Sequence, residues 1–244
     1  MREWMDIAVL APARDIDIAS VPGLRDEVDA LIAAGRRRIL VNCENVTFID
    51  STGVAFLLSR ARRLMREDGL LSLVNVSAEV SRFLQIARLV DVLHVTGREK
   101  PPVPLLSPGT LPLWSRSISV AEGVEHLALY RHRVVELLET LPLGRDAIYD
   151  TALAAGEALG NAYDHAGAAG CVLNARAYPD RVVIEVCDCG GGFELAPGEE
   201  VAASEERGRG ITLMRMLVDS VEVRRRADVQ GTMVRLIKLF DQHA

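Results

Sequence analysis

The middle of the chain is rich in proline, and this divides the sequence into two parts. Five of its ten prolines lie between Gly97 and Pro112, a stretch without helical or strand periodicity. Proline removes the backbone N–H that helices and sheets use, so such a segment is extended, at about 3.1 Å per residue. We therefore expect two α/β domains, residues 1–98 and 113–244, joined by a linker at residues 99–112.

Strand-like and helix-like segments alternate in the first domain. Strands are expected at residues 7–18, 38–43 and 70–76, and helices after Ser20, near Ser51 and after Ser77. Residues 38–43 are nearly all apolar, which is typical of a strand covered on both faces. The alternation predicts one small α/β domain.

The second domain has a different order of elements. Strands are expected at residues 114–120, 171–177, 181–187, 221–226 and 232–240, with helices at 124–141, 145–166 and after Arg207. Pro179 and Asp180 separate two of these strands and predict a hairpin turn.

A row of polar side chains lies on the expected helix at residues 145–166. Glu157, Asn161 and His165 are spaced by four residues, so a helix places them on one face of a segment that is otherwise mostly alanine and leucine. The row is either a solvated helix face or one wall of a ligand site, and the segment alone favours neither.

Ser51 lies where an apolar strand gives way to a helix. A serine at a helix start is usually an N-cap that accepts a backbone N–H. The string Phe-Ile-Asp-Ser-Thr-Gly-Val at residues 48–54 nevertheless resembles the signature of STAS domains, the anti-anti-sigma-factor family, and the resemblance covers residues 5–96. It implies that Ser51 is a phosphate acceptor, with Thr52 the neighbour to exclude. A phosphate there would add about −1.5 to −2 charges.

Four short patterns follow one another in the second domain. They are Glu157-x-x-x-Asn161, Asp188-x-Gly190-x-Gly192, Gly208-x-Gly210 and Gly231-Thr232. In this order they resemble the nucleotide-binding boxes of the GHKL or Bergerat ATP-binding fold over residues 113–239. With a STAS-like domain before them, they resemble the anti-sigma-factor serine kinases in particular. The resemblance implies an α/β sandwich with a mixed sheet and helices on one face.

The resemblance also implies a role for each patterned residue. Asn161 would offer an amide oxygen to Mg²⁺, and Asp188 would accept a hydrogen bond from the adenine amino group. Glu157 would orient a hydroxyl nucleophile or take its proton. The remaining nucleotide-binding set would be Gly190, Gly192 and Thr232 around the base, and Gly208 and Gly210, with their neighbours Arg207, Arg209 and Ile211, at the phosphates. His165 stays outside the catalytic set.

These resemblances predict a serine protein kinase of the partner-switching type, which uses ATP and Mg²⁺, leaves ADP, and phosphorylates its own Ser51 or the serine of a separate STAS protein. The partners implied are a sigma factor or equivalent target, STAS proteins and a phosphatase, and a homodimer is expected. One alternative is a binding module that nucleotide controls without phosphoryl transfer. Another is a histidine kinase, but neither His126 nor His132 precedes the acidic residue and proline of such a site.

Composition narrows the classes of function. The formal net charge is −6 and the arginines are dispersed, which argues against direct nucleic-acid binding. No apolar run reaches the roughly 20 residues of a membrane span, and the N-terminus lacks the apolar core of a signal peptide, so we expect a cytoplasmic protein without membrane contact. Cys187 and Cys189 lack the spacing of a zinc site, and buried, reduced thiols are expected for all four cysteines.

Overall fold

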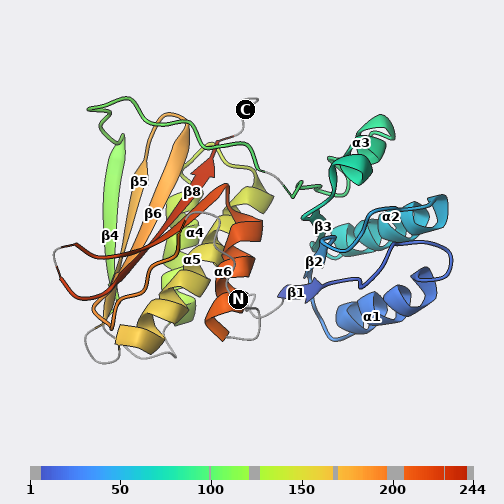
Figure 1. Ribbon diagram of the computed structural model, residues 1–244, viewed down its shortest axis with the longest axis horizontal. Coiled ribbons are helices and arrows are strands. Elements are labelled where there is room, and N and C mark those ends of the chain that lie inside the picture. The colour runs from blue at the N-terminus through green and yellow to red at the C-terminus, as the bar shows by residue number, and fades with distance from the viewer. Residues whose placement is uncertain are drawn as a thin grey trace. The chain divides into compact units, whose positions relative to one another are not determined.

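The computed structural model describes residues 7–98, 100–120, 127–166, 170–196, 206–227 and 229–240, with the backbone alone at residues 127, 128, 166 and 206–209. The chain forms two compact units, residues 1–100 and 101–244 (Figure 1). None of the described helices is both long enough and apolar enough to cross a membrane.

The N-terminal unit is built on a parallel sheet. Its elements are β1 (Ile7–Leu10), α1 (Val21–Ala33), β2 (Arg38–Asn42), α2 (Ser51–Arg66), β3 (Leu70–Val74) and α3 (Ala78–Ile86). The strands pair in the order β1-β2-β3, and both pairings are parallel. All five residues of β2 are buried, as expected for a central strand that is covered on both faces.

The helix boundaries follow from local chemistry. Pro22 lies in the first turn of α1, and the left-handed Gly35, with a φ of 85°, follows its end. The Ser77 hydroxyl accepts a hydrogen bond from the backbone N–H of Val80 and thereby caps α3.

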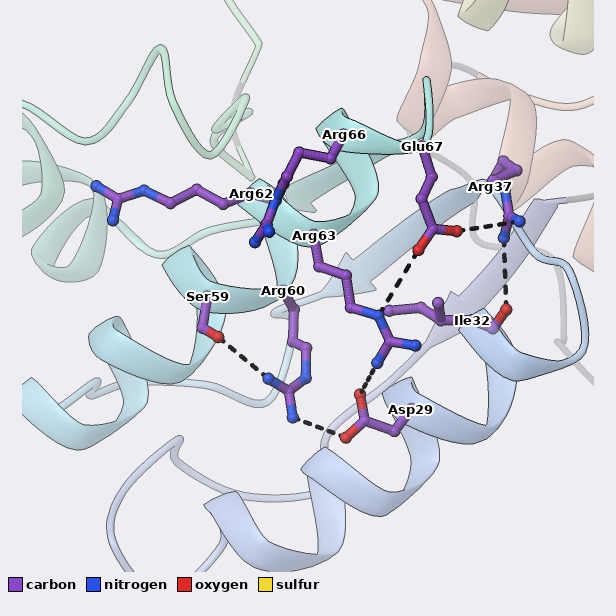
Figure 2. A network of polar contacts seen from close by, with 9 residues as sticks. All are labelled: Asp29, Ile32, Arg37, Ser59, Arg60, Arg62, Arg63, Arg66 and Glu67. Carbon is purple, nitrogen blue, oxygen red and sulfur yellow. Dashed lines mark hydrogen bonds and ion pairs between the residues drawn. The ribbon is translucent and has the colours of Figure 1, made fainter.

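A network of ion pairs joins α1 to α2 on the surface of this unit. Asp29 of α1 accepts from Arg60 at 2.7 Å and from Arg63 at 3.2 Å, both on α2. Glu67, just after α2, pairs with Arg37 at 3.0 Å and with Arg63 at 3.8 Å. Figure 2 shows Asp29 and Glu67 on either side of Arg63. Because these side chains are partly exposed, we expect each pair to contribute little to stability.

The C-terminal unit is built on a five-stranded sheet. Its elements are β4 (Trp114–Val120), α4 (Leu127–Leu138), α5 (Arg145–Ala166), β5 (Cys171–Ala177), β6 (Arg181–Asp188), α6 (Glu206–Leu217), β7 (Ser220–Arg225) and β8 (Thr232–Leu239). The strand order is β4-β5-β6-β8-β7. Every pairing of these strands is antiparallel, whereas a mixed sheet was expected from the sequence. The reason is that the hairpin partner β8 inserts between β7 and β6 and separates the two strands that run in the same direction.

The helices of this unit gather on one face of the sheet, as expected (Figure 1). α5 packs against β5, β6 and β8, and both α4 and α6 pack against α5. Alternate residues of β5 are buried on the helix side. The alanine-rich face of α5 permits this close packing, since Ala154, Ala155 and Ala158 are fully buried.

Two further observations concern the proline-rich segment and the cysteines. The proline-rich segment is tied to the C-terminal unit, because Arg181 donates a hydrogen bond to the carbonyl of Pro104 at 2.5 Å. The four cysteines form no disulfide, but only Cys43 and Cys171 are buried. Cys187 is half-buried and Cys189 is exposed, because it follows the last residue of β6 and leaves the sheet.

Candidate functional site

In the N-terminal unit, the candidate site is the turn that begins α2. Ser51 is exposed and is the first residue of the helix, but it is not the N-cap. Asp50 has that role, since its Oδ1 accepts from the backbone N–H of Gly53 at 2.7 Å. The structural role that a serine usually has at a helix start is therefore taken by its neighbour.

Hydrogen bonds join this turn to a second loop, at residues 15–18. The other carboxylate oxygen of Asp50 accepts from the backbone N–H of Ile18 at 3.0 Å. Asp15 accepts from the backbone N–H groups of Thr47 and Phe48 at 2.7 and 2.9 Å, and these hydrogen bonds lower the pKa of Asp15 below its usual range. Ile18 and Phe48 are nonetheless 72% and 57% exposed, so apolar surface lies beside the turn that carries Ser51.

In the C-terminal unit, the candidate site is a cavity of about 130 Å³ between α5, α6 and the sheet. Ligand pockets are typically about 300–1,000 Å³, so this cavity suits one ring system of a ligand better than a whole nucleotide. Five predicted site residues line it: Asn161, Asp188, Gly192, Ile211 and Thr232. The other lining residues are Ala162, His165, Gly191, Phe193, Met214, Val223 and Val234.

Asp188 is the most constrained polar group of this cavity. It ends β6 and is 4% exposed. Its Oδ1 accepts from the backbone N–H of Gly190 at 2.8 Å and from that of Thr232 at 3.0 Å. Both donors use the same oxygen, so Oδ2 can accept a hydrogen bond from a ligand.

The last predicted pattern, Gly231-Thr232, supports Asp188 from the start of β8. The Thr232 hydroxyl accepts from the backbone N–H of Phe193 at 3.2 Å, which joins the two loops at the cavity. Gly231 has a φ of 144°, and a β-carbon there would lie 2.1 Å from the Asp188 carbonyl oxygen. Only glycine permits this approach.

Glu157 and Asn161 lie one turn apart on α5 and converge on α6. A β-carbon at Gly210 would lie 3.6 Å from Glu157 Oε2, 3.0 Å from Asn161 Nδ2 and 3.6 Å from Asn161 Oδ1. The polar row predicted from sequence therefore faces α6 at these two positions. It is not a simple solvated helix face, although His165 at its end is exposed.

Burial affects the charge of Glu157. Removal from water raises the pKa of Glu157 above its ordinary value, and the positive charge of Arg131 on α4 partly opposes this rise. A carboxylate with a raised pKa beside a cavity is suited to accept a proton.

The glycines near the start of α6 differ from prediction. Gly208 and Gly210 were expected to precede the helix, but α6 begins at Glu206 and includes both. Gly210 lies inside the helix, where its missing side chain leaves room for Asn161 and Glu157. The side chains of Arg207 and Arg209 fall outside the described part of the chain.

The donors at the site fit a magnesium ion that arrives with a nucleotide. Among the described residues, no group of three or more His, Cys, Asp or Glu side chains could hold a metal. Mg²⁺ commonly keeps several waters and takes one or two protein ligands together with substrate phosphates. The amide oxygen of Asn161 would suffice as such a ligand, and the ion would offset charge on the phosphates.

Several contacts were not found from sequence. Arg131 lies more than twenty residues before Glu157, and the packing of α4 on α5 places its side chain against Gly156, the residue before Glu157. Phe193 and the apolar wall of the cavity, from α6, β7 and β8, carry no motif. His165, left outside the catalytic set, does line the cavity, where it continues the spacing of Glu157 and Asn161.

Comparison with known proteins assigns a family to each unit. The STAS domain family model matches residues 1–100, and the histidine kinase-like ATPase domain model matches residues 120–238. An anti-sigma-B factor antagonist of Staphylococcus aureus (strain NCTC 8325 / PS 47) is 33% identical over 81 residues, which cover 33% of this chain and 75% of that protein. A protein of the same name from Staphylococcus epidermidis is 30% identical over 81 residues, with the same coverage.

Among solved structures, the anti-sigma factor antagonist SpoIIAA in its unphosphorylated form is 28% identical. The match covers 33% of this chain and 74% of that chain, with a TM-score of 0.30, and adds nothing to the sequence matches. The chain therefore belongs, in its N-terminal unit, to the STAS-domain family of anti-sigma-factor antagonists, and it carries a histidine kinase-like ATPase domain in its C-terminal unit.

Proposed function

We propose that the C-terminal unit is an ATP-dependent serine kinase whose substrate is a STAS-domain serine, either Ser51 of this chain or the equivalent residue of a separate protein. Phosphorylation would control the binding of a sigma factor or a similar regulatory target, so the protein would act as a partner-switching regulator in the cytoplasm. The observation that carries this proposal is the convergence of Glu157 and Asn161 on Gly210, next to the cavity that holds Asp188.

The cavity supports adenine as the ligand. Asp188 Oδ2 would accept a hydrogen bond from the exocyclic amino group of adenine, whereas guanine has a carbonyl oxygen at that position and would face the carboxylate with an acceptor. The apolar lining from Ile211, Met214 and Val223 would pack against the faces of the ring. The residues at the start of α6 would bind the phosphates through free backbone N–H groups.

The proposed reaction is transfer of the γ-phosphoryl group of ATP to a hydroxyl. The serine Oγ forms a bond to the γ-phosphorus, and the bond from this phosphorus to the bridging oxygen of the β-phosphate breaks, which leaves ADP with the electron pair. The proton of the hydroxyl moves to the Glu157 carboxylate. Asn161 would hold the magnesium ion that offsets charge on the phosphates.

The surface around Ser51 supports its role as an acceptor and as a switch. The hydroxyl is on an exposed turn beside the apolar side chains of Ile18 and Phe48, which are suited to contact a partner. A phosphate there would be close to the Asp50 carboxylate. A partner packed over this turn would have to desolvate the added charge, so phosphorylation should weaken such a complex.

The direct test is incubation of the full chain with Mg-ATP, followed by mass-spectrometric mapping of phosphopeptides. We expect phosphate on Ser51, none in the Ser51→Ala variant, and no loss in Ser59→Ala, which removes another exposed serine from the same helix. Glu157→Gln should slow transfer by about 10²–10⁴-fold, while calorimetry should find ATP binding retained.

A mixture of two variants separates transfer within a chain from transfer between chains. Ser51→Ala supplies an active kinase without an acceptor, and Glu157→Gln supplies an acceptor without the proposed base. Phosphate on the second variant means transfer between chains. If neither Ser51 nor a separate STAS protein accepts phosphate, the kinase proposal is wrong. If Glu157→Gln instead leaves control of partner binding unchanged, the chain is a nucleotide-controlled binding module.

A further inference from the structure

Arg226 contacts Asp188 from the turn between β7 and β8. Its Nη1 donates a hydrogen bond to the main-chain carbonyl oxygen of Asp188 at 3.1 Å and lies 3.7 Å from Cys189 Sγ. A hydrogen bond from a guanidinium is charge-assisted and is stronger than one between neutral groups. The contact joins residues that are 38 positions apart in the chain, and Arg226 belongs to none of the four patterns in the sequence.

The main chain of the same turn also meets this carbonyl group. The backbone N–H of Arg226 donates to the Gly231 carbonyl oxygen at 3.0 Å and closes the turn. Gly231 lies so close to Asp188 that a β-carbon would be 2.1 Å from its carbonyl oxygen and 2.8 Å from its carbonyl carbon. The Arg226 side chain and the Gly231 main chain therefore hold the peptide that follows Asp188 from two points of one turn.

The orientation of the Asp188 carboxylate depends on this peptide. Asp188 Oδ1 accepts from the backbone N–H groups of Gly190 and Thr232 at 2.8 and 3.0 Å. Gly190 is two residues after Asp188, so the first of these hydrogen bonds closes a side-chain turn across the peptide that Arg226 contacts. Rotation of that peptide would move the Gly190 N–H away from Oδ1, and the carboxylate would lose one of the two hydrogen bonds that orient it.

We propose that Arg226 is a positioning residue for adenine recognition, which fixes the peptide after Asp188 so that Asp188 Oδ2 faces the amino group of the base. This inference rests on the proposed function, in which the cavity binds adenine. Arg226 is not among the described residues that line the cavity, so it acts on the nucleotide through Asp188. Its loss therefore weakens the contact with the amino group and leaves the contacts with the rest of the nucleotide.

The test compares ATP with purine riboside triphosphate, which keeps the purine ring, the ribose and the phosphates but lacks the exocyclic amino group. Calorimetry on the full chain measures both affinities. Because the lost hydrogen bond has a charged acceptor, we expect the wild type to prefer ATP by about 10–100-fold. In Arg226→Ala, ATP affinity should fall by about 10-fold, while the affinity for purine riboside triphosphate changes by less than about twofold.

Further variants test whether Arg226 acts through the carboxylate. Arg226→Lys keeps the charge but loses the planar guanidinium, so its preference for ATP should lie between those of the wild type and Arg226→Ala. In an Asp188→Asn background, Arg226→Ala should reduce the preference no further, because the carboxylate that it positions is gone. The matched control is Arg224→Ala, which removes a neighbouring arginine that pairs with Glu222 at 3.2 Å. Both affinities of this control should stay within about twofold of wild type.

Amide hydrogen exchange reports on the two donors directly. In Arg226→Ala, the N–H groups of Gly190 and Thr232 should exchange faster than in the wild type, because the carboxylate that accepts from them is less well held. The amides in the middle of β5 should exchange at the wild-type rate. Faster exchange throughout the sheet would mean a general loss of stability and would contradict a positioning role.

The outcomes separate this inference from the proposed function. If the wild type binds no ATP, both fail. If Arg226→Ala keeps the wild-type preference for ATP, only the inference is wrong. The inference also fails if the wild type has no preference between the two nucleotides, if both affinities fall together in Arg226→Ala, or if Arg224→Ala has the same effect. Circular dichroism checks that each variant is folded, and Arg226→Gln, which keeps an uncharged donor, replaces Arg226→Ala in the comparison if the latter is not.

Discussion

Each of the two units contains an aspartate that accepts hydrogen bonds from the backbone of two segments. The two aspartates differ in how their oxygens are used. In the N-terminal unit, Asp50 binds Gly53 N–H with one carboxylate oxygen and Ile18 N–H with the other. In the C-terminal unit, Asp188 uses Oδ1 for two backbone donors, from Gly190 and Thr232. Each oxygen of Asp50 therefore accepts one backbone hydrogen bond, whereas the two backbone donors of Asp188 share one oxygen and leave Oδ2 to accept from a ligand.

A glycine packed against a carbonyl oxygen accompanies each aspartate. A β-carbon at Gly53 would lie 2.3 Å from the Ile16 carbonyl oxygen, and one at Gly231 would lie 2.1 Å from the Asp188 carbonyl oxygen. Both contacts bring two loops closer than a side chain would permit. The result is an exposed turn that presents Ser51 in one unit and a cavity in the other.

Replacement of each aspartate by alanine should have the largest effects, and the two variants should differ in ATP affinity and in stability. Asp188→Ala leaves two backbone N–H groups without an acceptor and removes the side chain that is proposed to accept a hydrogen bond from adenine. We expect ATP affinity to fall by about 100-fold and the stability of the C-terminal unit by about 2–4 kcal/mol. Asp50→Ala removes an N-cap on a partly exposed turn and should cost about 1 kcal/mol without effect on ATP affinity.

Calorimetry measures the affinities, and amide hydrogen exchange on the full chain assigns each loss of stability to one unit. Equal losses of stability in the two variants would contradict the distinction between a buried aspartate and a partly exposed one. Unchanged ATP affinity in Asp188→Ala would remove Asp188 from the proposed nucleotide site.

A second substitution tests the close packing of Gly53. Gly53→Ala should destabilise the N-terminal unit by about 1–3 kcal/mol, because the new methyl group meets the Ile16 carbonyl oxygen at 2.3 Å and the two segments must separate. The control is Gly23→Ala in the first turn of α1, where nothing lies within 4 Å, and we expect a change within about 0.5 kcal/mol. Denaturant unfolding followed by hydrogen exchange measures both, and similar values for the two would refute the contact.

As the pH falls, the contributions that carboxyl groups of the two units make to folding stability should change in opposite directions. Backbone hydrogen bonds lower the pKa of Asp15 and Asp17 below the ordinary 3.8, so the stability they contribute is present above pH 3.8 and is lost as the pH falls through their folded values. Burial raises the pKa of Glu157 above 4.5, so its ionisation opposes folding above that pH and ceases to do so in acid. Carboxyl carbon-13 titration by NMR tests this, and a Glu157 midpoint below 4.5 would contradict it.

Much of the fold was predictable because it follows from local chemistry. The helix near Ser51 was expected, and α2 begins there. Strand expectations at residues 114–120 and 171–177 match β4 and β5, since alternating or continuous apolar residues specify strands wherever one face is buried. The antiparallel order of the C-terminal sheet was not predictable, because insertion of β8 between β6 and β7 leaves no local pattern.

Some features of the candidate site were likewise predictable from the sequence, and others were not. The spacing of Glu157 and Asn161 indicated from sequence that the two side chains share one helix face, because the helical repeat alone determines it. That this face meets Gly210 inside α6, and not a glycine loop before it, depends on how two helices pack. The sequence likewise could not identify Asp50, rather than Ser51, as the cap of α2, since either residue type can cap a helix.

The sequence by itself determined the division into two parts at the prolines, the serine at a strand-to-helix turn and the order of the polar and glycine-rich patterns. These are properties of neighbouring residues, and local propensity and periodicity express them directly. Only the tertiary structure decided which backbone donors bind each aspartate and that Arg131 of α4 packs against Gly156 of α5. Those contacts join segments far apart in the chain, and close packing of helices and loops, not local preference, selects them.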